Sequence, residues 1–159
     1  MSKSLKRVKR ALDAANVAAE VLEMADGTRT AAEAAAAAHC ALDQIAKSII
    51  FRAETSGEAV LFVTAGGHQV DIAKASAVAG EPLGKADAAL IRAQTGFAIG
   101  GVAPIGHLSP IRAWWDPLLS EFDVVYAAAG TPRHIFPIAP DILQKMSGAS
   151  RADFVTQAH

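Results

Sequence analysis

Apolar residues recur in this chain at two spacings, one typical of helices and one typical of strands. Leu5, Val8 and Leu12 follow the helical spacing, and the apolar residues after Asn16 alternate as in a short strand. The same spacings, bounded by capping and turn residues, predict the remaining elements. Helices are predicted over about 5–15, 72–79, 85–94 and 140–146, with a short one after 116. Another is predicted to begin at a capping box, residues 30–33, and to continue through the alanine run 34–38. Strands are predicted over about 17–23, 44–51, 58–64, 111–115, 123–129 and 134–138.

This order interleaves helices with hairpins, which indicates an α+β domain with a mixed sheet. We expect one compact domain over residues 1–159, because the chain has neither a repeat nor an internal linker. The first few residues and residues 149–159 are expected to be peripheral, the latter as a frayed tail.

Composition narrows the class of protein only moderately. Hydrophobic residues make up 52% and charged residues 19% of the chain, an ordinary globular balance, and the single Cys40 excludes an internal disulfide, in keeping with a cytoplasmic protein. The net charge of −1 excludes nucleic-acid binding through a global positive field but leaves a local contact open. Five basic residues do lie in the first ten positions, either as a solvated helix face or as a surface that steers phosphates.

The segment from Thr95 to His107, TGFAIGGVAPIGH, is the strongest candidate for a site. Its glycines allow positive φ and close approach of another molecule, and peptide N–H groups are its main donors. No formally charged residue occurs between Ala93 and Ile111, as in a membrane span, but the glycines and prolines there oppose a helix. We therefore predict a buried loop with short strands and no membrane segment.

Lys47 is the second unusual position. In a regular strand over 44–51 it shares a face with Ile45, Ile49 and Phe51, which are core-like residues. Because an unpaired buried ammonium is costly, Lys47 should snorkel, form a structural ion pair, or meet the phosphate or carboxylate of a ligand.

The usual catalytic constellations are missing. The five histidines have no metal-ligand spacing, and there is no nucleophile elbow, P-loop or dinucleotide fingerprint, so we expect neither metal nor cofactor. Any catalysis should rely on backbone donors. His107, at the end of the loop, either orients a substrate hydroxyl or water, or satisfies a loop carbonyl.

Taken together, these segments resemble the YbaK/ProX family, the editing domains associated with prolyl-tRNA synthetase and their free-standing relatives. The resemblance covers about residues 17–146 and rests on order and spacing. The matching segments are QIAKSIIF around Lys47, Asp71 to Lys74, the glycine loop, Asp116, the AAAGTP stretch at 127–132 and the closing PDIL. It implies a YbaK-like domain whose mixed sheet curves into a partly open barrel with surrounding helices.

The resemblance also implies hydrolysis, in trans, of the ester that joins a wrong amino acid to the 3′-terminal adenosine of a tRNA. The mischarged amino acid would be alanine, cysteine, serine or threonine, and the partners would be the tRNA acceptor end and prolyl-tRNA synthetase. The catalytic positions it implies are Lys47, Gly100, Gly101, Val102, Ala103 and Pro104. Substrate contacts are expected at Phe51, Asp71, Lys74, His107 and Gly130.

One position departs from the pattern of the family. Ala103 stands where some relatives carry Ser or Thr, so a hydroxyl contact is absent there and side-chain specificity cannot be carried over. Two alternatives stay open: a non-catalytic module that binds aminoacyl-tRNA or a nucleotide, and a hydrolase for another small ester or an aminoacyl-adenylate.

Overall fold

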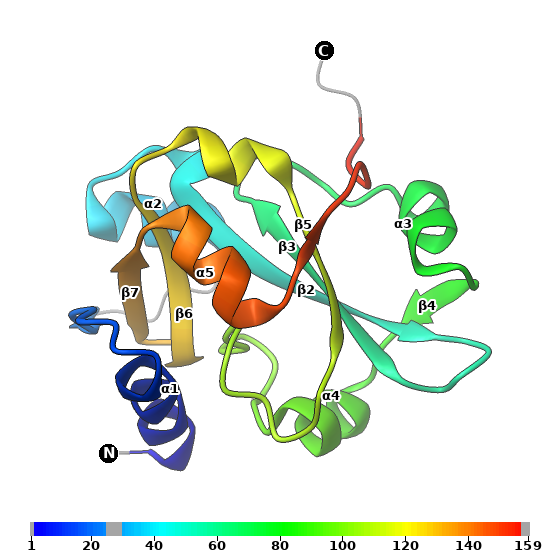
Figure 1. The fold of residues 1–159 in the computed structure, drawn as a ribbon, viewed down its shortest axis with the longest axis horizontal. Coiled ribbons are helices and arrows are strands. Elements are labelled where there is room, and N and C mark those ends of the chain that lie inside the picture. Colours follow the sequence, from blue (N-terminus) through cyan, green and yellow to red (C-terminus); the bar gives the residue numbers. More distant parts are fainter. Residues whose placement is uncertain (1, 25–29, 157–159) are drawn as a thin grey trace.

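The computed structural model describes residues 2–24 and 30–156, which form a mixed sheet with helices around it (Figure 1). The helices in this part of the chain are α1 (Lys3–Ala14), α2 (Ala31–Ala38), α3 (Ile72–Ala79), α4 (Ala88–Thr95), α5 (Pro140–Ser147) and two 3₁₀ turns, Leu42–Gln44 and Pro117–Glu121. The strands are β1 (Leu22–Glu23), β2 (Ile45–Ala53), β3 (Ala59–Ala65), β4 (Leu83–Lys85), β5 (Arg112–Trp115), β6 (Val125–Thr131), β7 (His134–Ile138) and β8 (Ser150–Arg151). The predicted α+β class is confirmed.

The strands form one sheet in the order β1-β7-β6-β2-β3-β5-β8, with β4 paired to β2 outside this path. Hairpins join β2 to β3 and β6 to β7 as antiparallel pairs. The pairs β2–β6, β3–β5 and β5–β8 are parallel. The sheet is therefore mixed, as predicted, and it stays open because its path ends at β1 and β8.

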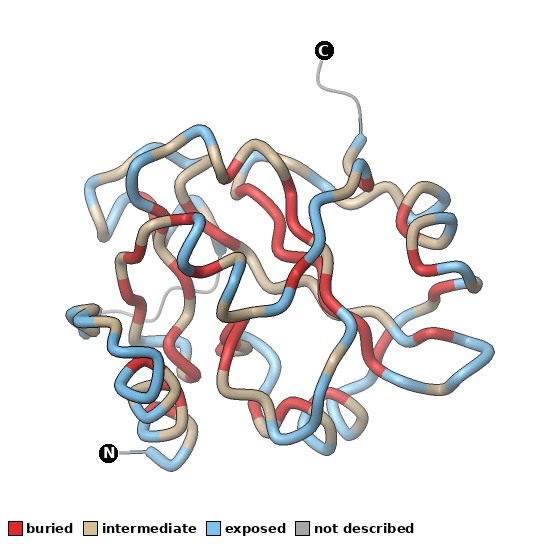
Figure 2. Tube along the Cα trace, in the orientation of Figure 1, coloured by how far each residue is buried: buried red, intermediate tan, exposed pale blue. Residues whose placement is uncertain are grey.

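The central hairpin has the alternation that the sequence predicts. Lys47 lies opposite Thr64 and Ile49 lies opposite Phe62, so these side chains share one face of the sheet. Every residue of β3 is buried (Figure 2). The reason is that side chains of the two core clusters pack on both faces of the sheet at this strand. Lys47 thus belongs to a largely apolar face, and its charge needs an explanation.

The main core lies on the opposite face, and the sheet curves around it. Strands β2, β3, β5, β6 and β7 all contribute side chains to one buried cluster. Helix α1 completes this cluster with Leu5, Val8 and Leu12, the three residues whose spacing predicts the helix. Burial of these three apolar side chains contributes about 1.5–3 kcal/mol each, which holds the N-terminal helix against β6.

Four sequence predictions differ from the structure. Strand pairing in the predicted strand 17–23 is limited to Leu22–Glu23, because the preceding residues pack against the core without a strand partner. The helix predicted to begin near Lys85 begins at Ala88 after an Asp87 cap, and Leu83–Lys85 pairs with β2 as β4.

The predicted frayed tail is the third difference. Ser150 and Arg151 pair with β5, Phe154 is completely buried, and Val155 bridges to Val70. Burial of the aromatic ring fixes this segment against the sheet, so residues 150–156 are part of the fold; residues 157–159 lie outside the described part of the chain.

The glycine loop leaves α4 at Gly96, which has a φ of +80° and ends the helix in the left-handed conformation. Between this residue and β5 the chain forms neither helix nor strand, so the short strands predicted in the loop are absent. Among the described residues, no helix combines the length and apolar character that crossing a membrane would require.

Candidate functional site

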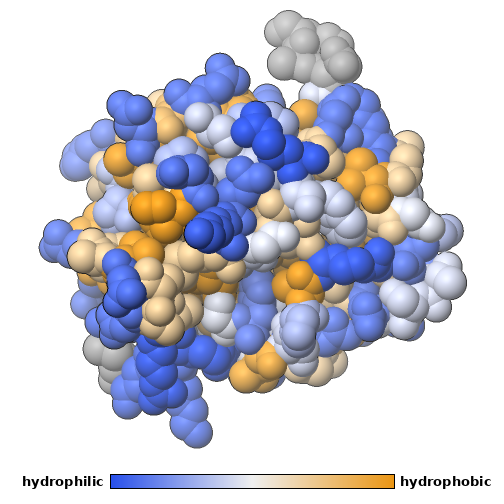
Figure 3. All heavy atoms as spheres, viewed as in Figure 1, coloured by the Kyte–Doolittle hydropathy of each residue, from blue (hydrophilic) through white to orange (hydrophobic). Residues whose placement is uncertain are grey.

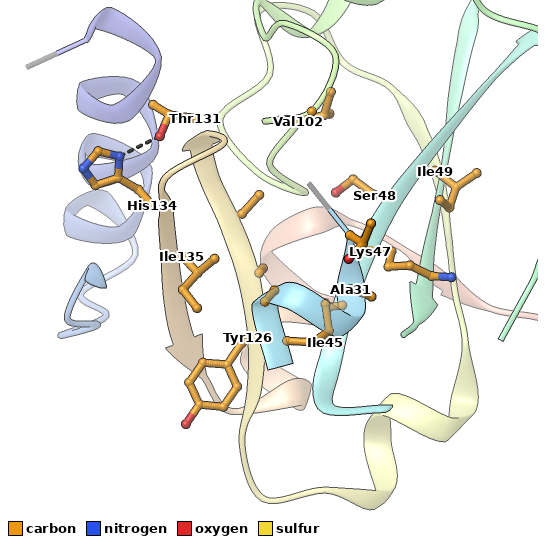
Figure 4. Close-up of a pocket in the computed structure, with 16 residues that line it drawn as sticks. Ala31, Ile45, Lys47, Ser48, Ile49, Val102, Tyr126, Thr131, His134 and Ile135 are labelled. Carbon is orange, nitrogen blue, oxygen red and sulfur yellow. Dashed lines mark hydrogen bonds between the residues drawn. The ribbon is translucent and has the colours of Figure 1, made fainter. Parts of the chain in front are cut away.

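A cavity of about 210 Å³ opens where two parallel strands separate. Strand β2 pairs with β6 only at Ile45 and Ala46, and the same edge pairs with β4 only from Phe51. The intervening stretch 47–50 has no strand partner on this edge among the described residues. The cavity lies along this gap (Figure 4). Its lining residues are Thr30, Ala31, Ala34, Ile45, Ala46, Lys47, Ser48, Ile49, Gly100, Val102, Tyr126, Ala127, Ala128, Thr131, His134 and Ile135.

Lys47 lines this cavity at β2, and its side chain extends away from Tyr126 and Ile135 (Figure 4). Its Nζ donates a hydrogen bond of 2.6 Å to the carbonyl oxygen of His68. Burial lowers the pKa of Lys47 below its usual 10.5, and the carboxylates of Asp116 and Asp43 oppose part of this shift. In the described part of the chain Lys47 forms no ion pair within 4.0 Å. Because an ammonium has three donors, this one can still bind an anion or an ester oxygen.

Asp116 fixes the carbonyl that holds Lys47. Its buried carboxylate accepts hydrogen bonds from the backbone N–H of Ala65 at 3.0 Å and of Leu118 at 3.1 Å, and it lies 2.7 Å from Nδ1 of His68. These contacts fasten the turn after β3 to the end of β5. Asp116 therefore positions Lys47 through His68, without lining the cavity itself.

Ser48 presents an unsatisfied hydroxyl beside Lys47. Its Oγ is buried and has no hydrogen-bond partner, although the residue lines the cavity. A buried hydroxyl without a partner costs about 1–3 kcal/mol, so a bound molecule that supplies a partner would recover this energy. We therefore include Ser48 in the candidate site.

We expect Ser48→Ala to stabilise the protein by about 1 kcal/mol and to lower kcat/KM for its substrate by roughly tenfold, because the substrate loses its hydroxyl partner. Urea unfolding and steady-state kinetics measure the two effects. Ser76→Ala is the matched control, since Ser76 Oγ accepts a hydrogen bond from the backbone N–H of Leu83, away from the cavity. The control should lose stability and retain activity. Equal activity in both variants would remove Ser48 from the site.

The glycine loop forms the next part of the wall through Gly100 and Val102. Gly100 has a φ of +94°, and a Cβ on Gly101 would lie 2.8 Å from backbone atoms of Thr131. The first glycine therefore permits the turn, and the second permits contact between the loop and the β6–β7 hairpin. Ala103 and Pro104, like Gly101, are buried behind the lining.

The donors of the loop differ from those expected. The N–H of Gly101 donates to the carbonyl of Ala98 at 3.1 Å, so it is used inside the turn. Among the described residues, the N–H groups of Gly100 and Val102 have no hydrogen-bond acceptor. Gly101, one of the catalytic positions that the resemblance implies, thus has no free N–H, whereas Gly100 and Val102 do.

His107 braces the loop from outside the cavity. Its Nε2 lies 2.8 Å from the carbonyl oxygen of Ala103, and its ring meets Phe97 edge-on. The guanidinium of Arg7 lies over the Phe97 ring. It also donates hydrogen bonds to the carbonyl oxygens of Gly106 at 2.8 Å and Thr95 at 3.4 Å. Of the two alternatives for His107, this geometry favours satisfaction of a loop carbonyl.

Burial lowers the pKa of His107 below its usual 6.5; the charge of Arg7 acts in the same direction, and the Ala103 hydrogen bond opposes them. The unfolded chain therefore binds more protons than the folded chain below about pH 6.5. We expect this residue's contribution to stability to be lost as the pH falls from there through the lowered pKa, by at most about 1.4 kcal/mol per pH unit. Between pH 7.5 and pH 5.5, the urea concentration at the unfolding midpoint should decrease more for the native chain than for His107→Gln. Equal falls would contradict this.

The other predicted substrate contacts do not line the cavity. Phe51 packs edge-on against Phe62 in the second core cluster, and Asp71 caps α3 by accepting from the N–H of Ala73 and Lys74. The ammonium of Lys74 pairs with Asp153 at 3.3 Å. Each of these side chains has a structural contact.

Gly130 lies beside the cavity lining at an irregularity in β6. It has a φ of +96°, and a Cβ there would meet the Ser4 carbonyl oxygen at 2.8 Å. The register of β6 against β7 shifts between Ala128 and Thr131. Gly130 thus lets α1 approach the sheet and turns Thr131 toward the loop.

The predicted site residues include Lys47, Gly100 and Val102 of this lining but none of its other polar residues, which besides Ser48 are Thr30, Tyr126, Thr131 and His134. Thr131 Oγ1 lies 2.6 Å from Nδ1 of His134 (Figure 4). The hairpin and the parallel β2–β6 pair bring them to Lys47, and no local pattern in the sequence signals such contacts. No group of three or more His, Cys, Asp or Glu among the described residues could hold a metal ion.

Comparison with known proteins gives consistent results. Residues 25–146 match the family model of the aminoacyl-tRNA editing domain. YwhH of Bacillus subtilis strain 168, an uncharacterized protein, is 30% identical over 144 residues, 91% of each chain. The crystal structure of a proposed trans-editing enzyme for prolyl tRNA synthetase is 40% identical, has a TM-score of 0.91 and overlaps 99% of both chains. The hypothetical protein APE2540 is 28% identical, with a TM-score of 0.85 over 94% of this chain and 99% of its own. The chain therefore belongs to the aminoacyl-tRNA editing domain family.

Proposed function

We propose that the protein is a free-standing deacylase that hydrolyses the ester of a mischarged tRNA. One observation carries the proposal: a single small cavity is lined by the Lys47 cation and by two loop residues with unused N–H donors, Gly100 and Val102. A cation and backbone donors in the wall of one cavity suit an aminoacyl ester, which gains negative charge as water attacks. Family membership and the similarity to a proposed trans-editing enzyme support the same reading.

Each group has a role in this proposal. The N–H groups of Gly100 and Val102 hold the carbonyl oxygen as it becomes an oxyanion, and donors of this kind contribute about 3–4 kcal/mol each. Lys47 binds the terminal phosphate or an oxygen of the aminoacyl-adenosine end. A loop carbonyl, or the neighbouring ribose hydroxyl of the substrate, positions the water. The water oxygen bonds to the ester carbon, the bond from that carbon to the ribose oxygen breaks, and the water proton passes to the ribose oxygen.

The size of the cavity favours a small amino acid. Its volume of about 210 Å³ is below the range of roughly 300–1,000 Å³ that holds a drug-sized ligand, so it suits the aminoacyl end of the substrate and not the whole nucleotide. Alanine side chains from α2, β2 and β6 form much of the wall. The hydroxyls of Ser48 and Thr131 add polar contacts. We therefore propose that the amino acid removed is alanine, cysteine, serine or threonine, attached in error to the tRNA for proline.

The test is release of labelled amino acid from tRNA charged with alanine, cysteine, serine or threonine, at substrate in large excess over protein. We expect many turnovers on at least one of them, and no release from correctly charged prolyl-tRNA. A folded protein that releases none of them would overturn the proposal. Stoichiometric retention of the charged tRNA without release would show a binding module in its place.

A further inference from the structure

A second, wider cavity of about 570 Å³ adjoins the candidate site. The two cavities share Thr131 and His134, so the β6–β7 hairpin forms the rim between them. Beyond that rim the wall contains Lys9 from α1 and Arg133 from the hairpin, together with one acidic residue, Glu23. A chain whose end occupies the first cavity would therefore cross the hairpin and meet a basic surface.

Helix α1 extends this basic surface away from the rim. It carries five basic residues and the single acidic residue Asp13, although the whole chain has a net charge of −1. Arg7 is committed to the glycine loop, but among the described residues Lys3, Lys6, Lys9 and Arg10 form no ion pair. Lys6 and Lys9 are one turn apart on α1; Lys9 lines the second cavity, and Asp13 lies one turn further along the same flank. Figure 3 shows the region of α1, at the lower left, as strongly hydrophilic.

A single exposed ion pair would contribute little to stability, but a polyanion can neutralise several surface cations at once. A row of unpaired cations beside the site therefore suits a polyanionic ligand. From Lys3 to Arg10 the charges extend about 10 Å along the helix axis, given a rise of 1.5 Å per residue. That length exceeds what one carboxylate or one phosphate could cover. The surface thus fits a ligand with repeated negative charge that continues from the first cavity.

We propose that Lys6, Lys9 and Arg133, here named the basic face, bind backbone phosphates of the tRNA acceptor stem. The proposal rests on the proposed function, which places the 3′ end of the tRNA in the first cavity. The strand would run over the Thr131–His134 rim onto α1. Because the net charge of the protein gives no general attraction to RNA, this face supplies the electrostatic part of the affinity.

The test uses the full chain and a fluorescent RNA hairpin that represents an acceptor stem with a single-stranded CCA end. Fluorescence anisotropy gives Kd at several salt concentrations for the native chain and for the triple variant Lys6→Ala, Lys9→Ala, Arg133→Ala. We expect the variant to bind roughly 10- to 100-fold more weakly, and the slope of log Kd against log salt to decrease by about one for each lost contact. The control Lys85→Ala, Arg92→Ala, Lys145→Ala removes the same charge from exposed residues of β4, α4 and α5.

A short CCA oligonucleotide distinguishes binding at the candidate site from binding at the basic face. Its Kd should change less than twofold in the triple variant, because it lacks the acceptor-stem phosphates that the basic face is proposed to bind. Unchanged hairpin affinity and salt slope in the triple variant, or an equal loss in the control variant, would overturn the basic face whatever the activity. If hairpin binding weakens as expected while no mischarged tRNA is hydrolysed by the native chain, the basic face stands and the deacylase proposal fails.

Discussion

Lys47→Ala should lower kcat/KM for the mischarged tRNA by at least about 100-fold while the protein stays folded. The loss follows from removing the cation on the cavity wall, because a charged hydrogen bond in a half-buried site is about twice as strong as a neutral one. Stability should change little, since the hydrogen bond to His68 is lost but the cost of burying an ammonium disappears as well. Single-turnover deacylation and urea unfolding measure the two quantities.

Two further variants test whether the charge of Lys47, and not its packing, accounts for the loss of activity. Lys47→Met retains the unbranched apolar stem, so it should be as inactive as the alanine variant if the charge is what acts. Lys85→Ala removes an exposed lysine from β4 and should behave like the native chain. Activity in Lys47→Met within threefold of the native value would show that packing, and not the ammonium, accounts for the effect of Lys47→Ala.

Gly101→Ala has the second largest expected effect. The added Cβ would lie 2.8 Å from Cα and from the carbonyl carbon of Thr131, and neither backbone atom can rotate away. The loop must then shift relative to the hairpin, which displaces the Gly100 and Val102 donors. A displacement of about 1 Å can cost 100-fold in rate, and overpacking of this kind costs about 1–3 kcal/mol of stability.

Gly84→Ala is the matched control for this substitution. A Cβ at Gly84 would meet only the exposed side chain of Glu54, whose carboxylate can move aside. The control should retain activity and nearly all of its stability. If Gly101→Ala is as active as Gly84→Ala, the close contact between loop and hairpin does not position the donors.

Local patterns in the sequence predict the elements that supply the site, but not the way they meet. The period of two places Lys47 correctly on the face of Ile49 and Phe62, since a strand paired along its length alternates regularly. Gly80 and Gly96 end their helices with positive φ, as helix-terminating glycines commonly do. These features depend on near neighbours in the chain, so the sequence contains them.

The cavity itself depends on contacts between distant segments. It exists because the pairing of β2 and β6 stops after two residues, and a strand sequence does not specify where a neighbour diverges. For the same reason Ser48 and His134 give no signal: one is an ordinary strand serine, and the other reaches the cavity through the hairpin. Strands β4 and β8 contain three and two residues, too few to show a period.

The contacts of Arg7 also bear on how the protein folds. Its hydrogen bond to Gly106 joins residues that are 99 positions apart, and Gly130, still further along the chain, must fit against Ser4. Closing so long a stretch of chain is entropically costly until the sheet has formed, which makes these contacts late events in folding. The glycine loop therefore reaches its final form only after the newly made C-terminal half has met the N-terminal helix, and a ribosome-bound fragment that ends before β6 would contain the loop without the site.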